Sequence, residues 1–343
     1  MGGYAPFSPT CVLSVELEDG VSWSIGKMRS YSVRANSFRS DLERMSVLSD
    51  KIVAGAENGS GVPVLMYYPV DRAIAAVPVN LHKSDPVIWD VYKDALSGNA
   101  NFRSLFEWYR RQEDIENEMI RDDAEYRDRS LEVIRRAIKN FFPNFSEMRV
   151  RRRPRQSMVI KKDDEEIEFT QLSQGEKCYL SLVCDIARRL AIANPSLPDP
   201  LNGNGIVLID EIDLHLHPKW QSEIVSKLIK IFPNCQFFLS THSPLVLSDV
   251  KRSQIIPLSN GEKMNISFET YGQLSSSIMS NYFDETQQRN KEIASQISDA
   301  FAAIREGNPE RFHKLLNSLQ QVLDMSDVDM VNLMIESKRR GIQ

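Results

Sequence analysis

The chain has 343 residues, enough to bury the core of one large domain or of two. Its net charge of −5, with 26% charged residues, is ordinary for a globular protein and gives no general nucleic-acid signal. The four cysteines are scattered without a C-x-x-C pair, which argues against a disulfide framework or a zinc site. No apolar run reaches the ~18–20 residues that span a bilayer, and no signal-peptide pattern follows Met1, which excludes a transporter built in one chain. The cysteine pattern indicates reduced thiols in a cytoplasmic protein, and nothing suggests a membrane partner.

The first part of the chain is predicted to contain strands and one helix. Residues 11–17 and 21–25 alternate like the two strands of a hairpin, with a turn at residues 18–20. Ser37–Lys51 has helical spacing. Val62–Tyr68 is a short apolar stretch typical of a strand.

A glycine-rich loop at Gly55–Gly61 superficially resembles a phosphate-binding loop. It follows a strand-like stretch, Ile52–Ala54, but Val62-Pro63 stands where Lys-Ser or Lys-Thr would bind the phosphates. A strand also follows where a helix should begin, so no helix N-terminus would point at a phosphate. We therefore interpret this segment as a surface loop.

The middle of the chain is predicted to be helical and then β-sheet. Phe102–Asn140 has apolar residues at helical spacing and predicts two helices with a bend, since no heptad pattern lasts three repeats. Glu147–Arg153, Ser157–Lys161 and Ile167–Thr170 predict three strands, with a charged turn at Asp163–Glu166. The last hundred residues predict further helices.

One of these strands carries a run of arginines. The run consists of Arg149, Arg151, Arg152, Arg153 and Arg155. One interpretation is a solvated hairpin whose charge is balanced by the acidic turn. The alternative is a contact with a nucleic-acid backbone that reads no bases, although no interleaved aromatic residues are present to stack on single-stranded bases.

Three motifs follow one another in the second half of the chain. Leu172–Glu176 (LSQGE) precedes a predicted helix, Gly205–Asp213 (GIVLIDEID) is an apolar strand ending in acids, and Leu239–Pro244 (LSTHSP) ends a second apolar strand. This order and spacing are typical of the second half of an ABC-type ATPase head. The phosphate loop G-x-x-x-x-G-K-[S/T], which should precede them, does not occur in the sequence.

Two of the motifs predict catalytic side chains at the end of a parallel sheet. P-loop enzymes hold magnesium and the attacking water at the carboxyl end of such a strand. Asp210 would bind Mg²⁺ and Glu211 would polarise the water. His242, at the tip of the neighbouring strand, would meet the γ-phosphate of ATP.

The LSQGE motif has a structural and a functional interpretation that can both hold. Ser173 and Gly175 would present a hydroxyl and backbone N–H groups to a phosphate at the start of the helix. The same serine with Glu176 forms a capping box.

Two further patterns give weaker indications of metal chemistry. His215 and His217 form an H-x-H pair without a third ligand in reach, which is more often structural. The D-x-D of a Toprim nuclease would have to be Asp327-Val328-Asp329, which stands in a predicted helix. We therefore do not predict an intrinsic nuclease.

Beyond the motifs, the sequence resembles the ABC-type ATPases of bacterial anti-phage systems, in particular the PtuA family of Septu and of retron-linked loci. The LIDEIDLHLHP segment is the most specific part. The matching stretches are Val64–Arg72, Phe106–Glu118, Leu172–Pro195, Gly205–Gln221, Phe232–Pro244 and, more weakly, Glu269–Gln273.

The resemblance implies an α/β ABC-type P-loop ATPase head, incomplete at the N-terminus, with an inserted helical segment and a helical C-terminal region. It implies a head-to-head homo-oligomer that holds ATP and Mg²⁺ between subunits, related in plan to SMC and RecF-type heads. Asp213 would belong to the D-loop, and Arg72 would sense the nucleotide or bridge the lobes. The implied partners are an HNH nuclease subunit and, in retron loci, a reverse transcriptase with its msDNA.

On this basis we expect four segments: residues 1–100 as the rest of the N-terminal ATPase lobe, 101–145 as a helical insertion, 146–260 as the lobe of the three motifs, and 261–343 as a helical C-terminal region. We expect roughly 60–80 residues with the phosphate loop to be absent. The chain alone should then bind ATP poorly.

The expected function is a regulatory ATPase subunit of an anti-phage defence complex, whose nucleotide state controls a partner nuclease. The alternatives are a non-catalytic scaffold without an ATP site of its own, and an SMC- or RecF-like ATPase of DNA repair.

Overall fold

The computed structural model describes residues 10–28, 40–70, 87–96, 102–283 and 289–342. The contacts between residues divide the chain into two compact units, residues 1–242 and 243–343. Each unit is described by itself.

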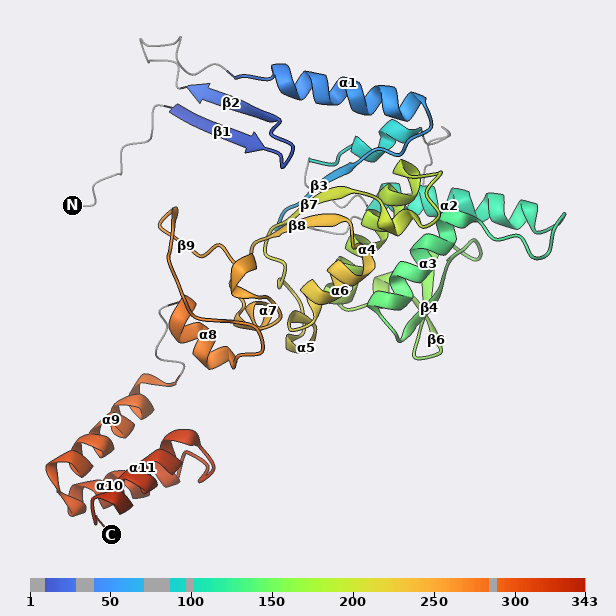
Figure 1. Ribbon diagram of the computed structural model, residues 1–343. Coiled ribbons are helices and arrows are strands. Elements are labelled where there is room, and N and C mark those ends of the chain that lie inside the picture. Colours follow the sequence, from blue (N-terminus) through green and yellow to red (C-terminus); the bar gives the residue numbers. More distant parts are fainter. Residues whose placement is uncertain (1–9, 29–39, 71–86, 97–101, 284–288, 343) are drawn as a thin grey trace. The chain divides into compact units, whose positions relative to one another are not determined.

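A parallel three-stranded sheet lies at the centre of the first unit (Figure 1). Its strands are β3 (Val64–Tyr68), β7 (Gly205–Ile209) and β8 (Cys235–Leu239), with β7 in the middle. These apolar runs are typical of strands in a buried parallel sheet. Because all three run in the same direction, the residues that follow them meet at one edge of the sheet.

The first unit contains a group of helices that lie far apart in the sequence, and all but the shortest of this group contribute buried residues to its core. They are α2 (Phe102–Met119), α3 (Arg129–Phe141), α4 (Gln174–Ala193), α5 (Pro218–Gln221) and α6 (Ile224–Ile231). Helix α4 is buried along nearly its whole length, as expected for a helix with apolar residues on every side. Its Tyr179 ring stacks on that of Phe141 from α3, with the centroids 6.3 Å apart. The predicted pair of helices in residues 102–140 is confirmed.

An antiparallel sheet follows α3. Its strands are β4 (Phe145–Arg151), β5 (Ser157–Lys162) and β6 (Glu165–Glu168), in that order. The three strands confirm the prediction, but β6 both begins and ends two residues earlier than expected, so Glu165 and Glu166 belong to the strand and not to the turn. Phe169 is buried and begins a short 3₁₀ turn, Phe169–Gln171, because the Gln171 side chain accepts the backbone N–H of Glu168 at 2.7 Å.

The N-terminal part contains the predicted hairpin and a helix of the expected length that begins six residues later than expected. The hairpin strands are β1 (Thr10–Glu16) and β2 (Ser22–Met28), and the helix is α1 (Glu43–Glu57). The strand-like interpretation of Ile52–Ala54 was wrong, because these residues continue α1. The helix ends where the N–H groups of Asn58 and Ser60 bond the carbonyl of Gly55 at 3.1 and 2.9 Å. A helix therefore precedes this turn and a strand follows it, the reverse of a phosphate loop. A 3₁₀ segment, η2 (Ile88–Tyr92), lies between β3 and α2 in the sequence.

The second unit is mainly helical, as predicted, with one very small hairpin. Its elements are α7 (Pro244–Leu247), η5 (Arg252–Gln254), β9 (Leu258–Ser259), β10 (Glu262–Lys263), α8 (Ser275–Tyr282), α9 (Lys291–Glu306), α10 (Pro309–Gln320) and α11 (Val328–Arg339). Gly307 ends α9 at φ +69°, Asn308 caps α10, and Pro309 takes the first helical position. Helices α9, α10 and α11 share a core that includes Phe312 and Met330.

A bilayer-spanning helix requires a long apolar stretch. Among the helices that the structure describes, none is long and apolar enough to cross a membrane.

Candidate functional site

Two acidic residues follow the central strand β7 at the carboxyl edge of the parallel sheet. The N–H of Asp210 donates to the Tyr68 carbonyl at 2.8 Å, and the N–H of Ile212 donates to the Ser240 carbonyl at 2.9 Å. Between them, Glu211 adopts φ +48°, a left-handed conformation that is rare outside glycine. Backbone pairing on both sides thus holds two consecutive carboxylates where the sheet ends.

The hydroxyl of Ser240 connects both acids. Its Oγ accepts the N–H of Glu211 at 2.8 Å and donates to Oδ1 of Asp210. From the sequence, Ser240 is expected only as the end of an apolar strand. The available signal was its place in LSTHSP, directly after the strand that pairs with β7.

The predicted neighbour of the acids, His242, lies beside Glu211. Its Nε2 is 3.4 Å from Oε1 of the glutamate, and its side chain is 81% exposed. The expectation that this histidine follows the strand next to β7 is confirmed. An exposed imidazole in this place can reach a group bound outside the edge of the sheet. Nearby, the hydroxyl of Thr241 donates to Oδ1 of Asp213, which fixes the predicted D-loop residue to the strand end.

The start of α4 forms the predicted capping box. The N–H of Glu176 donates to Ser173 Oγ at 3.3 Å, and the N–H of Ser173 donates to Glu176 Oε2 at 2.9 Å. Burial would raise the pKa of the Glu176 carboxyl, but the hydrogen bonds from Lys162 and Ser173 lower it overall. The carboxylate therefore stays charged as a cap, and the exposed Ser173 hydroxyl stands at a helix N-terminus.

Gly175 packs tightly against the loop that follows Asp213. A Cβ added at this glycine would lie 2.4 Å from the carbonyl oxygen of His215, which itself adopts φ +64°. Only glycine allows this approach, so the structure gives Gly175 a packing role that the sequence interpretation did not contain. The LSQGE segment and the loop after β7 are therefore in direct contact.

The two histidines of that loop have structural contacts. His215 presents its carbonyl to Gly175, and Nδ1 of His217 accepts the N–H of Lys219 at 3.3 Å, which caps α5. In the parts of the chain that the structure describes, no group of three or more histidine, cysteine, aspartate or glutamate side chains is arranged to hold a metal ion.

A buried ion cluster links α4 to the strand that supports Asp210. Asp185 accepts hydrogen bonds from the Tyr68 hydroxyl at 2.9 Å, from Arg188 at 2.6 Å and from Arg189 at 2.9 Å. All four side chains are buried. Burial would raise the pKa of Asp185, but the two guanidinium groups lower it to about 2. Burial next to this carboxylate also raises the pKa of Tyr68 well above its usual range. No motif in the sequence indicates this cluster.

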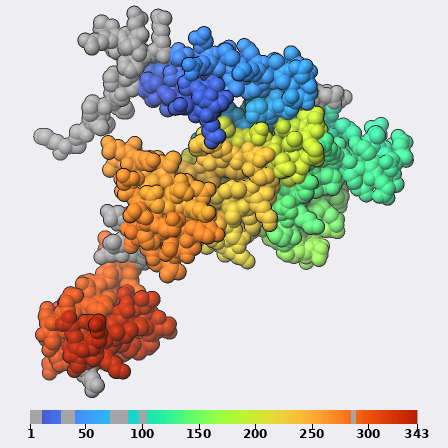
Figure 2. All heavy atoms as spheres, in the orientation of Figure 1, coloured from blue at the N-terminus to red at the C-terminus, as the bar shows by residue number. Residues whose placement is uncertain are grey.

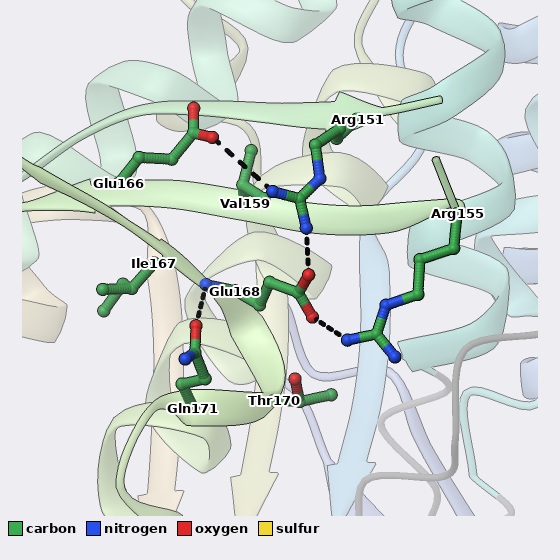
Figure 3. Close-up of a pocket in the computed structure, with 8 residues that line it drawn as sticks. All are labelled: Arg151, Arg155, Val159, Glu166, Ile167, Glu168, Thr170 and Gln171. Atoms are coloured by element: carbon green, nitrogen blue, oxygen red, sulfur yellow. Dashed lines mark hydrogen bonds and ion pairs between the residues drawn. The ribbon is translucent and has the colours of Figure 1, made fainter. Parts of the chain in front are cut away.

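The arginine run lies on the β4–β5–β6 sheet and is largely paired with carboxylates. Figure 3 shows Arg151 and Arg155 converging on Glu168 in a pocket of about 340 Å³, and Arg155 lies 2.7 Å from that carboxylate. Further pairs join Arg149 to Glu166, Arg151 to Glu166 at 3.9 Å, and Arg152 to Glu113 and Asp114. Arg153 is exposed and precedes a cis peptide bond to Pro154. The charge of the run is thus balanced, but only Glu166 belongs to the predicted acidic turn, and the other acids lie elsewhere in the first unit. A nucleic-acid contact stays the alternative prediction. Arg72, the other basic residue singled out in the sequence, lies outside the described residues.

The chain is similar to a known protein family and to named proteins. The family described as "AAA domain, putative AbiEii toxin, Type IV TA system" matches residues 68–248, just over half of the chain. "Retron Vc95 probable ATPase" of Vibrio cholerae is 38% identical over 71% of this chain and 57% of that protein. "Retron Ec83 probable ATPase" of Escherichia coli is 29% identical over 81% and 63%. "Septu protein PtuA" of Bacillus mycoides is 48% identical over 28% and 13%.

The chain thus spans about three fifths of the length of the two retron relatives. Among solved structures, the SMC head domain from Thermotoga maritima is similar with a TM-score of 0.26 and 22% identity, over 39% of this chain and 44% of that one.

The family match covers α4, β7, β8 and the segments next to them, where all the predicted site residues that the structure brings together are found. It confirms the predicted α/β P-loop ATPase fold class. The chain belongs to this AAA domain family, and its relatives include retron ATPases and the Septu protein PtuA.

Proposed function

We propose that the chain is an ATP- and Mg²⁺-binding regulatory subunit of a bacterial anti-phage defence complex. The observation that carries the proposal is the cluster of Asp210, Glu211, Ser240 and His242 at one edge of a parallel sheet. Side chains of this kind at such an edge suit a nucleotide and its metal. The names of the retron and Septu relatives support the placement in defence.

Each residue of the edge has a distinct chemical role in this proposal. Magnesium is commonly held by one or two carboxylates together with substrate phosphates, and a single Asp210 suits that mode. Since Ser240 hydrogen-bonds Oδ1 of Asp210, the second carboxylate oxygen can face the ion. Bound Mg²⁺ would neutralise phosphate charge, while Glu211 accepts a proton from water and His242 contacts the terminal phosphate.

The site would be completed by a second copy. Ser173 stands with an exposed hydroxyl at the start of α4, where Gly175 and Glu176 fix the turn. We propose that this segment of one head contacts ATP on the other, so that nucleotide drives head-to-head dimerisation. The dimer would control an HNH nuclease subunit and, in a retron setting, a reverse transcriptase with its msDNA.

A second candidate function is a non-catalytic scaffold. One observation favours it: the sequence contains no G-x-x-x-x-G-K-[S/T], and the loop at Gly59–Gly61 lies between a helix and a strand rather than a strand and a helix. In that case the chain would assemble with its partners without holding ATP by itself.

Equilibrium binding of a fluorescent ATP analogue with Mg²⁺ to this chain distinguishes the two. The ATPase proposal expects saturable binding that Asp210→Ala abolishes and that Asp299→Ala, which changes an exposed acid on α9, leaves intact. Absence of detectable binding by the wild-type chain would favour the scaffold. Binding that survives Asp210→Ala would place the nucleotide elsewhere.

Removing the Ser240 hydroxyl, which bonds both Asp210 and Glu211, should weaken the Mg²⁺-dependent part of nucleotide binding. We expect Ser240→Ala to lower the affinity for the Mg²⁺–nucleotide complex ~10–100-fold, as loss of a side chain that orients a metal ligand commonly does. The measurement is the same titration at several Mg²⁺ concentrations. Ser226→Ala is the control, because that hydroxyl is exposed on α6 and bonds the Glu223 carbonyl. Equal affinities of the two variants would contradict the role of Ser240.

A further inference from the structure

Helix α11 is apolar on two opposite faces. Met330 and Leu333 are fully buried and pack into the core of the α9–α11 helices. Val328, Val331 and Ile335, spaced i, i+3 and i+7, are 71%, 39% and 55% exposed. This spacing places the three side chains in one stripe along the helix, pointing away from the core. In Figure 2 the residues of these helices form one compact cluster (red).

Exposed aliphatic side chains scattered singly need no explanation, but a continuous stripe is typical of a helix that packs against another element. The three aliphatic residues occupy the positions that one helix offers to a second. Asn332 lies beside them and is also exposed. The stripe is therefore suited to a helical partner about 18 Å long, the length of α11.

The charges at the two ends of α11 identify the partner. The N-terminal end carries the carboxylates Asp324, Asp327 and Asp329, and Arg289 pairs with the last two. The C-terminal end carries the cations Lys338, Arg339 and Arg340, and Glu336 pairs with the two arginines. The N-terminal end of α11 therefore has a net negative charge, and the C-terminal end has a net positive charge.

We propose that this outer face of α11 binds the same face of a second copy of the chain, with the two helices antiparallel. In that arrangement the acidic end of each helix meets the basic end of the other, and both apolar stripes are covered. Val328 of one copy lies opposite Ile335 of the other, and Val331 lies near the twofold axis. A parallel pair would place like charges together, which opposes association.

A second copy is favoured over a different protein because α11 carries both an acidic and a basic end, and each end is complementary to the opposite end of another α11. An isologous contact requires a self-complementary surface, and an apolar stripe between opposite charges is one. This contact needs no nucleotide, so it is separate from the ATP-dependent head dimer proposed above.

The first test is sedimentation equilibrium of the full chain without nucleotide. We expect a dimer whose dissociation constant rises at least tenfold in Val331→Lys/Ile335→Lys. Ile256→Lys/Leu274→Lys is the matched control, because it changes two exposed aliphatic residues of the same unit that do not belong to α11. Circular dichroism should show unchanged helix content in both variants, since all four side chains are exposed.

Two outcomes of this test would overturn the proposal. A wild-type chain that stays monomeric without nucleotide would show that the stripe is not covered by a second copy, whatever else covers it. A Val331→Lys/Ile335→Lys variant that dimerises as the wild type does would place the contact on another surface.

Disulfide cross-linking tests the direction of the helices. In a Cys11→Ser background, which removes an exposed thiol, chains with Val328→Cys are mixed with chains with Ile335→Cys and oxidised. We expect the disulfide between positions 328 and 335 to dominate in peptide mass spectrometry. Predominant 328–328 and 335–335 disulfides would show a parallel pair and contradict the proposed arrangement.

Discussion

Asp185→Ala should lower the free energy of unfolding by about 3–5 kcal/mol, the cost of removing one partner from a buried ion pair. The substitution leaves the guanidinium groups of Arg188 and Arg189 buried without their carboxylate. It also removes the acceptor of the Tyr68 hydroxyl. The remaining bonds from Arg189, to the carbonyls of Val91 and Lys93, cannot neutralise its charge.

The expected loss is a large part of the stability of a typical domain, about 5–15 kcal/mol. Urea unfolding followed by circular dichroism measures it. Asp299→Ala provides the matched control, because Asp299 pairs with Arg311 at 3.4 Å on the surface and should change stability by less than ~1 kcal/mol. If both alanine variants lost the same small amount of unfolding free energy, the buried cluster would not stabilise the fold.

The Asp185 carboxylate also makes the stability of the fold depend on pH. Burial raises the pKa of Asp185 and the two arginines lower it more, to about 2, below the ~3.9 of an unfolded aspartate. Because the folded pKa is depressed, the stabilisation is fully present above ~pH 4 and is lost as the pH falls toward 2. The difference in stability between wild type and Asp185→Asn should therefore shrink across this window. A difference that stays constant down to pH 2 would contradict the shifted pKa.

The structure explains why the sequence revealed the acidic edge but not this cluster. Asp210 and Glu211 directly follow the apolar run of β7, so the strand pattern alone places them at a sheet end. Asp185 stands inside α4, and its partner Tyr68 is 117 positions away in the chain. Local periodicity contains no information about that contact, which exists only because α4 packs against β3.

The errors in element bounds have a similar cause. Ile52–Ala54 is a short apolar run, and such a run suits a strand or a helix equally well in isolation. It joined α1 because the helical pattern before it continues to Glu57. The close contact between Gly175 and His215 could not be predicted from the sequence either, because it depends on how two segments from different motifs pack together.

Glu211→Gln should lower ATP turnover ~10²–10⁴-fold, the usual effect of removing a general base. Glutamine keeps the shape of the side chain and can still hydrogen-bond His242, but it cannot accept a proton from water. Since Glu211 is not proposed as the metal ligand, the affinity for the Mg²⁺–nucleotide complex should change by less than ~3-fold, within the ordinary spread for a neutral contact. Loss of turnover with intact binding is the signature that separates this residue from Asp210.

Steady-state release of phosphate and the fluorescent titration supply the two measurements. Glu223→Gln is the matched control, because Glu223 pairs with Lys227 at 3.0 Å on the surface and should turn over ATP as the wild type does. A Glu211→Gln variant with wild-type turnover would show that the glutamate takes no part in proton transfer. A variant that loses both binding and turnover would show instead that the Glu211 side chain is a ligand of the Mg²⁺–nucleotide complex. Its position would allow this, because the Ser240 hydroxyl bonds both the Glu211 N–H and the Asp210 carboxylate.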